Sequence, residues 1–504
     1  MRDDDDRVPT GVPGLDYVLL GGFLREGFYL VQGDPGSGKT TVALQFARGR
    51  VAAGEACLYI SLTESRRDLE NAARSHGWNL DGIVLCDLTR SAANLAGEPE
   101  SSVFHPSETE LGETTKAIFA AVESAKPRHV VFDGLSEMRL LAGNPLVYRR
   151  QLLAMKDFFA ERHATVVLLD DRSSAFGIDS PESLVGGTIV LERTLPEYGR
   201  ARRRLYVTKV RGAKFREGFH DYEIQQGGVA VHPRLVAAEH HDRFVSTVMP
   251  SGVPNLDTML AGGLTAGSTT LLLGPAGVGK STVAMQFAVT AMKVGSKAAV
   301  YMFDEVLDIL VGRVDKLCLG KEGGLRGYIG DGLLHAQQVD PAEMSPGAFA
   351  HEVERAVDAG AKVIIIDSLN GYLNAMPEER FLTTHLHEMF AFLNQRGVLT
   401  LMVVAQHGMI VGSGGMGDVD VSYLADTVLL FRYFEARGEI QQAISVFKKR
   451  TGAHERTLRQ LRISAVGLSV GEPLREFRGV MSGIPVYEGG ASGANLAVDR
   501  EDAF

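Results

Sequence analysis

The sequence predicts an α/β protein made of two tandem copies of one domain, each a mostly parallel sheet flanked by helices with an antiparallel extension. The first observation is a repeat: residues 33–40 and 274–281 both fit the pattern G-x-x-x-x-G-K-[ST]. Their flanks repeat too, because GVPGLD (residues 11–16) matches GVPNLD (residues 252–257). The second observation is that strand-like and helical runs alternate and then give way to consecutive strands, which is typical of this fold class.

The repeated pattern is a phosphate-binding loop when a strand precedes it and a helix follows. Residues 27–32 and 40–54 meet this condition in the first copy, and residues 269–273 and 281–295 meet it in the second. Backbone N–H groups of such a loop hold phosphate oxygens, and its glycines allow the close approach. The expected nucleotide-binding residues are Gly33, Asp34, Pro35, Gly36, Ser37, Gly38, Lys39, Thr40 and Thr41, and in the second copy Gly274, Pro275, Ala276, Gly277, Val278, Gly279, Lys280, Ser281 and Thr282.

Each copy also supplies a cation and oxygen donors. Lys39 and Lys280 are expected to reach the terminal phosphates, where they would assist catalysis. Apolar strands at residues 129–133 and 362–367 each end in an aspartate, the usual donor to Mg²⁺ after a phosphate loop. ATP and Mg²⁺ are therefore the predicted cofactors. The expected metal ligands are Thr40, Asp133, Ser281 and Asp367.

Acidic residues follow a second predicted strand in each copy. The strand at residues 57–62 leads to Glu64, and Ser65 is placed to cap the next helix. In the second copy the run at residues 299–305 ends in Asp304 and Glu305. The carboxyl ends of parallel strands are where catalytic groups of open α/β sheets usually lie. These acids are candidates for orienting or deprotonating a nucleophile, and an exposed acid at a turn is the alternative for Glu64.

The remaining elements are predicted from the same patterns. Helices are expected at residues 114–126 and 144–163, strands without intervening helices at residues 187–194, 203–210 and 219–224, and a late strand at residues 427–438. Two Lys-x-Arg pairs recur on β segments well after each aspartate strand. Positive charge on a leaving phosphate often comes from a neighbouring subunit, so the pairs could act across an interface; solvated surface cations are the alternative. The pairs are Lys209 with Arg211 and Lys448 with Arg450.

Length and composition restrict the function classes. The 504 residues divide by the repeat into domains at 1–245 and 246–487, followed by a Gly/Ala/Ser-rich, acidic tail at 488–504 that is expected to be flexible. A formal net charge of −10 disfavours general binding to nucleic acid or an anionic membrane. The acidic start MRDDDDR is no signal peptide, no run approaches the ~18 apolar residues of a membrane span, and three scattered cysteines fit a reducing compartment. A cytoplasmic location is expected.

Together these residues resemble the KaiC family of RecA-like ATPases from about Gly11 to Pro485. The resemblance includes both phosphate loops, the GVPGLD and GVPNLD flanks, ARSHGWNL after the first acid, both Lys-x-Arg segments, FEARGEI and MSGIP. It implies two tandem RecA-like domains in a two-tier homohexamer, in which ATP lies between subunits and Lys209, Arg211, Lys448 and Arg450 act in trans. It also implies that the acids after the second strand activate water or a protein hydroxyl.

The chain departs from this family in two places. The family's acid pair is Glu-Glu, whereas this chain has Thr63-Glu64 in one copy and Asp304-Glu305 in the other. In the family, the second domain phosphorylates adjacent Ser and Thr residues near its own ATP, and Ser422 and Tyr423 stand at the corresponding positions. Both are candidate phosphoacceptors; the tail after Pro485 does not resemble the family's partner-binding tail.

Three functional hypotheses follow. The first is a KaiC-like, ATP-hydrolysing ring protein with serine autokinase activity at Ser422. The second is a nucleotide-gated assembly that binds ATP with little turnover and signals to an unidentified regulatory protein, which Thr63 favours for the first domain. A mixed form would let the first domain hold the ring while the second carries out the chemistry. The third is a RecA-like, DNA-dependent ATPase, which the net charge disfavours.

Overall fold

A computed structural model describes residues 6–89, 106–172, 181–240, 244–317, 324–340, 342–374, 382–405, 422–436, 438–480 and 486–487. The chain divides into two compact units: residues 1–234 with 345–351, and residues 235–344 with 352–504. Among the described helices, none is long and apolar enough to cross a bilayer. The tail predicted at 488–504 lies outside the described residues, as do residues 406–421.

In the described part of the first unit, the main sheet has the strand order β11-β10-β9-β8-β3-β7-β6-β4-β5. Neighbours from β8 to β5 run parallel, and β8 to β11 form an antiparallel series. The predicted parallel core with an antiparallel extension is therefore confirmed. The strands are β3 (Phe28–Gly33), β4 (Cys57–Ser61), β5 (Ile83–Asp87), β6 (His129–Asp133), β7 (Thr165–Asp171), β8 (Gly187–Thr194), β9 (Arg202–Val210), β10 (His220–Gln225) and β11 (Gly228–His232).

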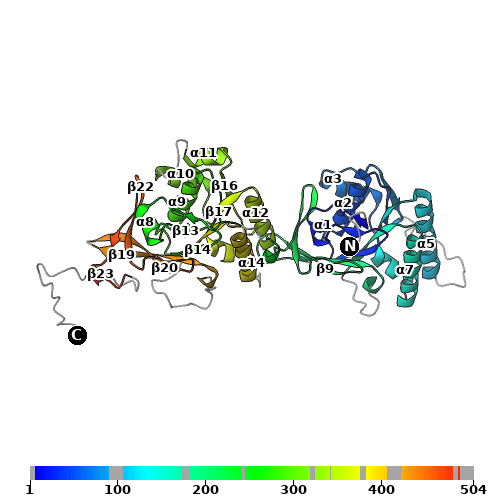
Figure 1. Ribbon diagram of the computed structural model, residues 1–504. Coiled ribbons are helices and arrows are strands. Elements are labelled where there is room, and N and C mark those ends of the chain that lie inside the picture. Colours follow the sequence, from blue (N-terminus) through cyan, green and yellow to red (C-terminus); the bar gives the residue numbers. More distant parts are fainter. Residues whose placement is uncertain are drawn as a thin grey trace, which may run out of the picture. The chain divides into compact units, whose positions relative to one another are not determined.

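Helices cover both faces of this sheet (Figure 1). Along β3, Tyr29 and Val31 pack toward α2 and α3, whereas Phe28 and Leu30 pack toward α5, α6 and α7. Alternate residues thus enter different cores, and this explains why the strand sequences are apolar throughout rather than alternating. The helices are α1 (Leu15–Val18), α2 (Lys39–Ala52), α3 (Arg66–Ser75), α5 (Pro106–Ala125), α6 (Leu135–Ala142) and α7 (Pro145–Ala160); β1 (Arg7–Val8) and β2 (Phe23–Leu24) form a separate pair.

The second unit repeats this plan within its described residues. Its main sheet has the order β16-β15-β17-β18-β14-β19-β20-β21-β22, with β16 to β19 parallel and β19 to β22 antiparallel. The strands are β14 (Thr269–Gly274), β15 (Lys297–Met302), β16 (Leu334–Gln338), β17 (Ala361–Asp367), β18 (Leu399–Ala405), β19 (Thr427–Ala436), β20 (Glu439–Lys449), β21 (Arg459–Ser464) and β22 (Gly467–Pro473). Two further pairs are β12 (Val248–Met249) with β13 (Leu264–Thr265), and β23 (Phe477–Arg478) with β24 (Val486–Tyr487).

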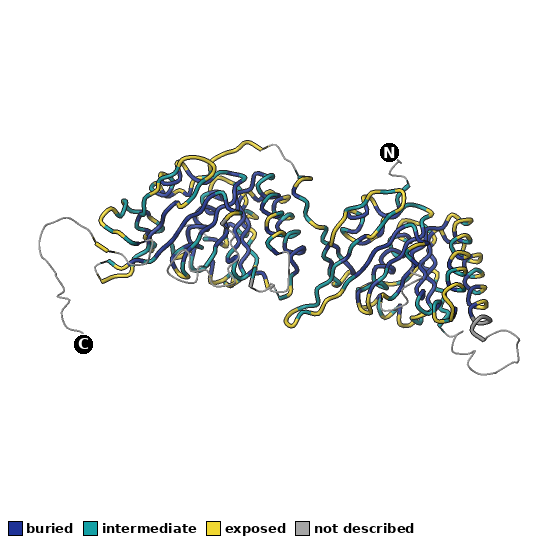
Figure 2. The backbone as a smooth tube through the Cα atoms, turned by 90° about the horizontal axis from the view of Figure 1, so that it is seen from below, coloured by how far each residue is buried: buried dark blue, intermediate teal, exposed yellow. Residues whose placement is uncertain are grey.

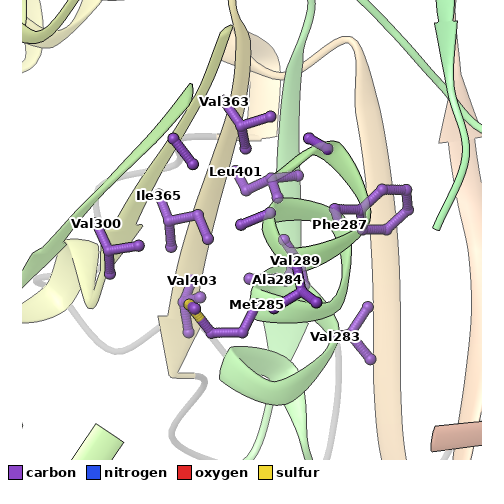
Figure 3. Close-up of a cluster of buried hydrophobic side chains, with 14 of the residues drawn as sticks. Val283, Ala284, Met285, Phe287, Val289, Val300, Val363, Ile365, Leu401 and Val403 are labelled. Carbon is purple, nitrogen blue, oxygen red and sulfur yellow. The ribbon is translucent and has the colours of Figure 1, made fainter. Parts of the chain in front are cut away.

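The helix that follows the second phosphate loop is the centre of the larger apolar core of this unit. Figure 3 shows Met285 of α9 reaching toward Val403 of the adjoining strands, with Phe287 on the opposite side of the helix; all three belong to this core, as do Ile365 and Leu401. Figure 2 shows that buried residues follow the strands of each unit, whereas exposed residues follow the outer sides of the helices and the loops. The helices are α8 (Pro254–Met259), α9 (Lys280–Lys293), α10 (Leu307–Lys316), α11 (Gly324–Gly330), α12 (Pro346–Asp358), α13 (Leu369–Asn374) and α14 (Leu382–Gln395).

The predicted elements agree with the structure except at their ends. The first loop strand is shifted by one residue to Phe28–Gly33, and its helix begins at Lys39 rather than Thr40. Ser65 caps α3 as predicted, because its side chain accepts a hydrogen bond from the Asp68 amide. The edge strands β5 and β16 and the outer strands β11, β21 and β22 are absent from the sequence prediction. Their polar or short sequences lack a clear apolar period, and pairing with neighbours provides their stability.

A buried charge cluster holds the start of β6, the strand that ends at Asp133. The ring of His129 is 1% exposed, and its Nε2 lies 2.9 Å from Oε2 of Glu55. Burial lowers the pKa of His129, so the neutral ring donates this hydrogen bond. Burial alone would raise the pKa of Glu55, but hydrogen bonds from Arg25 and His129 outweigh it and lower that pKa.

We expect the first unit to lose stability as pH falls below about 6.5, where the unfolded chain protonates His129 and the folded chain does not. The free energy of unfolding should fall by up to about 1.4 kcal/mol per pH unit for each such histidine, and His220, buried likewise, adds to the effect. Trp78 is the chain's one tryptophan and reports this unit. Its fluorescence should show a flatter pH dependence of the melting temperature in His129→Gln; an unchanged slope would contradict this account.

Candidate nucleotide sites

The first phosphate loop has the backbone that the pattern requires. Gly36 and Gly38 have φ of 76° and 99°, and Gly38 directly precedes α2. A Cβ added to Gly38 would lie 2.7 Å from Cδ1 of Ile224, so the position excludes side chains by space as well as by conformation. The hydroxyl of Tyr222 donates to the carbonyl oxygen of Ser37 at 2.6 Å. The loop is therefore supported by the antiparallel extension of its own sheet.

Lys39 lies inside this loop. Its Nζ donates to the carbonyl oxygens of Gly33 and Asp34 at 2.8 and 3.1 Å, and it forms an ion pair with Asp171 at 2.7 Å. Asp171 ends β7 beside Gly33, its partner in the sheet register. A bound phosphate would compete with these oxygens for the ammonium group. The sequence prediction placed Lys39 correctly in the loop but gave Asp171 no role.

The predicted metal acid of the first unit is already engaged. Asp133 is 7% exposed, and its two oxygens accept hydrogen bonds from the hydroxyl of Tyr59 at 2.8 Å and of Thr63 at 3.2 Å. Burial raises the pKa of Asp133 in spite of these bonds. Thr40, the predicted hydroxyl ligand, donates instead to Glu64 at 3.3 Å. The oxygen donors for Mg²⁺ are all present, but their lone pairs are partly used within the protein.

Glu64 stands where a base for the first site would be needed. It follows the carboxyl end of β4, with its backbone N–H bound to Oγ of Ser61 at 2.9 Å. Burial, and then the neighbouring charge of Asp133, raise its pKa. A carboxylate with a raised pKa is a stronger proton acceptor. The first site thus has one acid in position, and Thr63 supplies a hydroxyl in place of a second.

The second loop repeats the geometry of the first. Gly277 and Gly279 have φ of 76° and 100°, and a Cβ on Gly279 would lie 2.4 Å from Cδ1 of Ile463. Nζ of Lys280 donates to the carbonyl oxygens of Gly274 and Pro275 at 2.8 and 2.5 Å. The strand position that Asp171 takes in the first unit belongs here to Ala405, so the corresponding ion pair has no counterpart.

In the second unit the predicted Mg²⁺ donors meet directly. Ser281 hydrogen-bonds Asp367, and this bond lowers the pKa of a carboxyl that burial raises. A hydroxyl and a carboxylate at the end of a phosphate loop are the donor types that Mg²⁺ prefers, so these two residues fit the ion. Among the residues that the structure describes, Asp367 thus has its loop serine as a hydroxyl partner, whereas the hydroxyl partners of Asp133 are Tyr59 and Thr63.

The acid pair of the second unit has its own partners. Asp304 accepts a hydrogen bond from the hydroxyl of Ser368, the residue after Asp367. Glu305 forms an ion pair with Arg313 of α10 at 2.8 Å. Burial raises the pKa of Glu305, while Arg313 opposes the rise. Both acids act electrostatically on or with the predicted metal acid Asp367.

The Lys-x-Arg pairs lie at the opposite end of each sheet from the phosphate loop. Lys209 is opposite Thr188, which pairs with Leu30, three residues before the loop begins at Gly33. Lys448 is likewise opposite Val428, which pairs with Leu271, three residues before Gly274. Each lysine thus lies back along the sheet from the phosphate loop of its own unit. Lys209 and Lys448 are the penultimate residues of β9 and β20, and Arg211 and Arg450 each follow the end of the strand.

Each of these cations has partners in its own unit. Lys209 donates to the carbonyl oxygen of Glu182, and Arg211 donates to that of Ser183 at 2.9 Å. Lys448 donates to the carbonyl oxygen of Ala425 at 2.8 Å. Burial lowers the pKa of Lys209, as does the charge of Arg211.

The candidate phosphoacceptors precede β19. Ser422 opens the short 3-10 turn η5 (Ser422–Leu424), and Tyr423 beside it is 52% exposed. Because β19 starts next to Thr270, this turn lies at the same end of the sheet as Lys448 and Arg450. The phosphate loop of the same unit begins at Gly274, four residues after Thr270 along β14, which is about 13 Å. Ser422 is therefore separated along the sheet from the phosphate loop of its own unit.

Sequence reasoning missed four polar residues around the two sites. Tyr59, Asp171, Ser368 and Arg313 contact predicted site residues but come from other strands or helices, or sit inside an apolar run. Only Asp171 was detectable, since it ends the strand run ATVVLLDD (residues 164–171). The others require the register between strands and the direction of a helical side chain.

Comparison with known proteins agrees with this geometry. The family described as "ATPase: KaiC" matches residues 8–236 and 249–475, once for each unit. "Circadian clock oscillator protein KaiC" of Parasynechococcus marenigrum (strain WH8102) is 26% identical over 95% of this chain and 93% of that protein. The proteins of the same name from Thermostichus vulcanus and Synechococcus elongatus (strain ATCC 33912 / PCC 7942 / FACHB-805) are each 25% identical over 95% of this chain and 92% of theirs. With two phosphate loops on two RecA-like sheets and a family match over both, the chain belongs to the KaiC family of ATPases.

Proposed function

We propose that this KaiC-family ATPase assembles into a homohexameric ring through its ATP sites, with residues 1–245 and 246–487 as its two domains and 488–504 as a tail. In this proposal the first domain holds the ring together and the second carries out most of the phosphoryl transfer. The observation that supports the division of labour is the set of hydroxyls around the metal acid: Tyr59 and Thr63, neither of them a predicted metal ligand, bind Asp133, whereas Asp367 is bound by Ser281, its predicted partner in holding Mg²⁺.

The second site can support phosphoryl transfer by known chemistry. Bound Mg²⁺ would neutralise charge on the phosphates beside Ser281 and Asp367. The carboxylate of Glu305 takes the proton of the attacking hydroxyl, from water or from Ser422. The attacking oxygen bonds to the γ-phosphorus as the bond to the bridging oxygen breaks, and ADP leaves. Water as the nucleophile gives hydrolysis, and Ser422 of a neighbouring chain gives phosphoserine. Such a protein would work in the cytoplasm with a regulatory protein not yet identified.

Replacing the candidate base of each domain separates the contributions of the two domains to phosphate release. We expect Glu64→Gln to lower phosphate release only modestly, because the first domain turns over slowly. The paired change Asp304→Asn with Glu305→Gln should remove most of the release, at least about a hundredfold for a lost base. Steady-state phosphate release in Mg-ATP measures both. The opposite ranking would assign the chemistry to the first domain, and negligible release from the unaltered protein would favour the assembly hypothesis.

Autophosphorylation is tested separately by intact-mass and phosphopeptide spectrometry after incubation with Mg-ATP. We expect one phosphate on Ser422, lost in Ser422→Ala and retained in Tyr423→Phe. Since Ser422 lies at the far end of the sheet from its own loop, Lys280→Ala subunits should become phosphorylated when mixed with Ser422→Ala subunits. Phosphate release without protein modification would leave an ATPase with no kinase activity.

A DNA-dependent ATPase is the remaining alternative. The net charge of −10 is unfavourable for binding a polyanion. Turnover stimulated by single-stranded DNA, with stimulation that disappears as salt is raised, would establish that function instead.

A further inference from the structure

Arg313 is a cation beside the second site that the reaction described above does not use. It lies on α10, eight residues after Glu305, and its guanidinium Nη2 is 2.8 Å from Oε2 of that acid. Long side chains on a helix point back toward its N-terminus, so Arg313 reaches the acid that precedes the helix. Both partners are partly buried, with side chains 34% and 22% exposed.

Among the residues described in the first unit, the position that corresponds to Arg313 holds no cation. Ser61 of β4 pairs with Asp133 and Met302 of β15 pairs with Asp367, so Glu64 corresponds to Glu305. The residue at the same distance after Glu64 is Ala72, on the matching helix α3. Glu64 is bound by Thr40 instead. The difference between the two sites is therefore built into their sequences.

The charges around Glu305 come from several elements. Asp304 precedes it and is bound by Ser368, Asp367 faces it from the end of β17, and Lys280 lies beside Asp367. Among the neighbours that the structure describes, Arg313 is the cation that directly contacts Glu305. Its charge also acts on Asp367 and opposes the rise in pKa that burial causes in both acids.

We propose that Arg313 is a positioning residue of the second nucleotide site, holding Oε2 of Glu305 so that Oε1 faces the nucleophile. This rests on the proposed role of Glu305 as base. One oxygen stays in the ion pair while the other takes the proton of the attacking hydroxyl, which leaves a neutral carboxyl beside the arginine. The ion pair keeps Glu305 ionised next to Asp304 and Asp367, and fixes its direction before ATP arrives.

The test uses the full-length protein with Glu64→Gln, which limits turnover to the second domain. Phosphate release is followed from pH 5 to 9 in Arg313→Ala, Arg313→Lys and the control Arg326→Ala. The control removes another arginine paired with an acid of α10, Asp308, but that pair is exposed. Thermal melting and KM for ATP are measured alongside, because a misfolded site would change both.

We expect Arg313→Ala to move the acid limb of the kcat profile upward by about one pH unit, which is about a tenfold loss on that limb. KM should stay within about twofold, since Arg313 makes no predicted contact with the nucleotide. Arg313→Lys should recover most of the activity, and Arg326→Ala should match the parent. An unmoved limb in Arg313→Ala would overturn the inference, as would equal losses in the alanine and lysine variants.

Failure of the inference can be told from failure of the proposed function. Glu305→Gln in the same background tests the base directly. If Glu305→Gln abolishes turnover while Arg313→Ala leaves the profile unchanged, the base stands and Arg313 is an ordinary surface ion pair. If Glu305→Gln leaves turnover unchanged, the assignment of the base is wrong and the role of Arg313 falls with it.

Discussion

Replacing Lys39 and Lys280 together by alanine should abolish ATP binding at both sites and prevent the ring from assembling. Each ammonium group already lies within the phosphate loop, bound to two loop carbonyl oxygens. Removing one partner of a buried charge-assisted contact costs roughly 3 kcal/mol, about a hundredfold in affinity at each site. If ATP lies between subunits, a ring without nucleotide also loses its interface.

Titration with a fluorescent ATP analogue and sedimentation velocity in Mg-ATP measure the two effects. Lys293→Ala is a suitable control, because Lys293 lies on the same helix as Lys280 but is exposed at its far end. We expect the control to bind and sediment as the parent does. Normal turnover in the double variant would contradict the phosphate-loop assignment, and a stable ring without nucleotide would show that assembly does not depend on ATP.

Local patterns explain why the phosphate loops could be predicted from sequence. Glycines with φ near 100°, such as Gly38 and Gly279, are required by the backbone itself, and no distant residue is needed to identify them. The strands that end at Asp133 and Asp367 were equally recognisable, because burial on both faces makes their sequences apolar throughout. Fold class and loop residues follow from such local constraints.

Contacts between distant elements explain what could not be predicted. Tyr59 reaches Asp133 only because β4 and β6 are parallel neighbours in a particular register. Ser368 and Arg313 depend similarly on a strand end and on the direction of a helical side chain. Lys209 lies back along the sheet from the phosphate loop of its own unit because β9 runs antiparallel to β8. Such placements follow from topology rather than from spacing along the chain.

The contacts at the two sites differ although the folds of the two units match. In the first unit, hydroxyls and an ion pair satisfy Asp133 and Lys39 within the protein. In the second, the metal acid meets its loop serine and the candidate base is held by an arginine. In the proposed division of labour, slow turnover at the first site would keep ATP bound between subunits, whereas the second site would transfer the phosphoryl group. Two copies of one fold would then serve assembly and chemistry separately.

Replacing the arginine of the second Lys-x-Arg pair should show that a neighbouring chain completes the second nucleotide site. Arg450→Ala is expected to lower turnover of the second domain by about a thousandfold, the usual effect of losing an arginine that acts in trans. The reason is geometric: Lys448 is opposite Val428, at the end of the sheet away from the loop that begins after Leu273. In the proposed ring, Arg450 would therefore act on the γ-phosphate bound by a neighbouring subunit. Arg462→Ala, an exposed arginine on β21, is the control.

Mixing experiments separate a trans role from a general loss of structure. Arg450→Ala subunits keep an intact phosphate loop, and Lys280→Ala subunits keep an intact arginine, while both retain the first domain for assembly. Each variant alone should be inactive in the second tier, and their mixture should recover turnover well above either one. Recovery requires the loop of one chain to meet the arginine of the next. A mixture as inactive as its components would mean that Arg450 acts within its own subunit or only stabilises the fold, and the ring model would lose its main support.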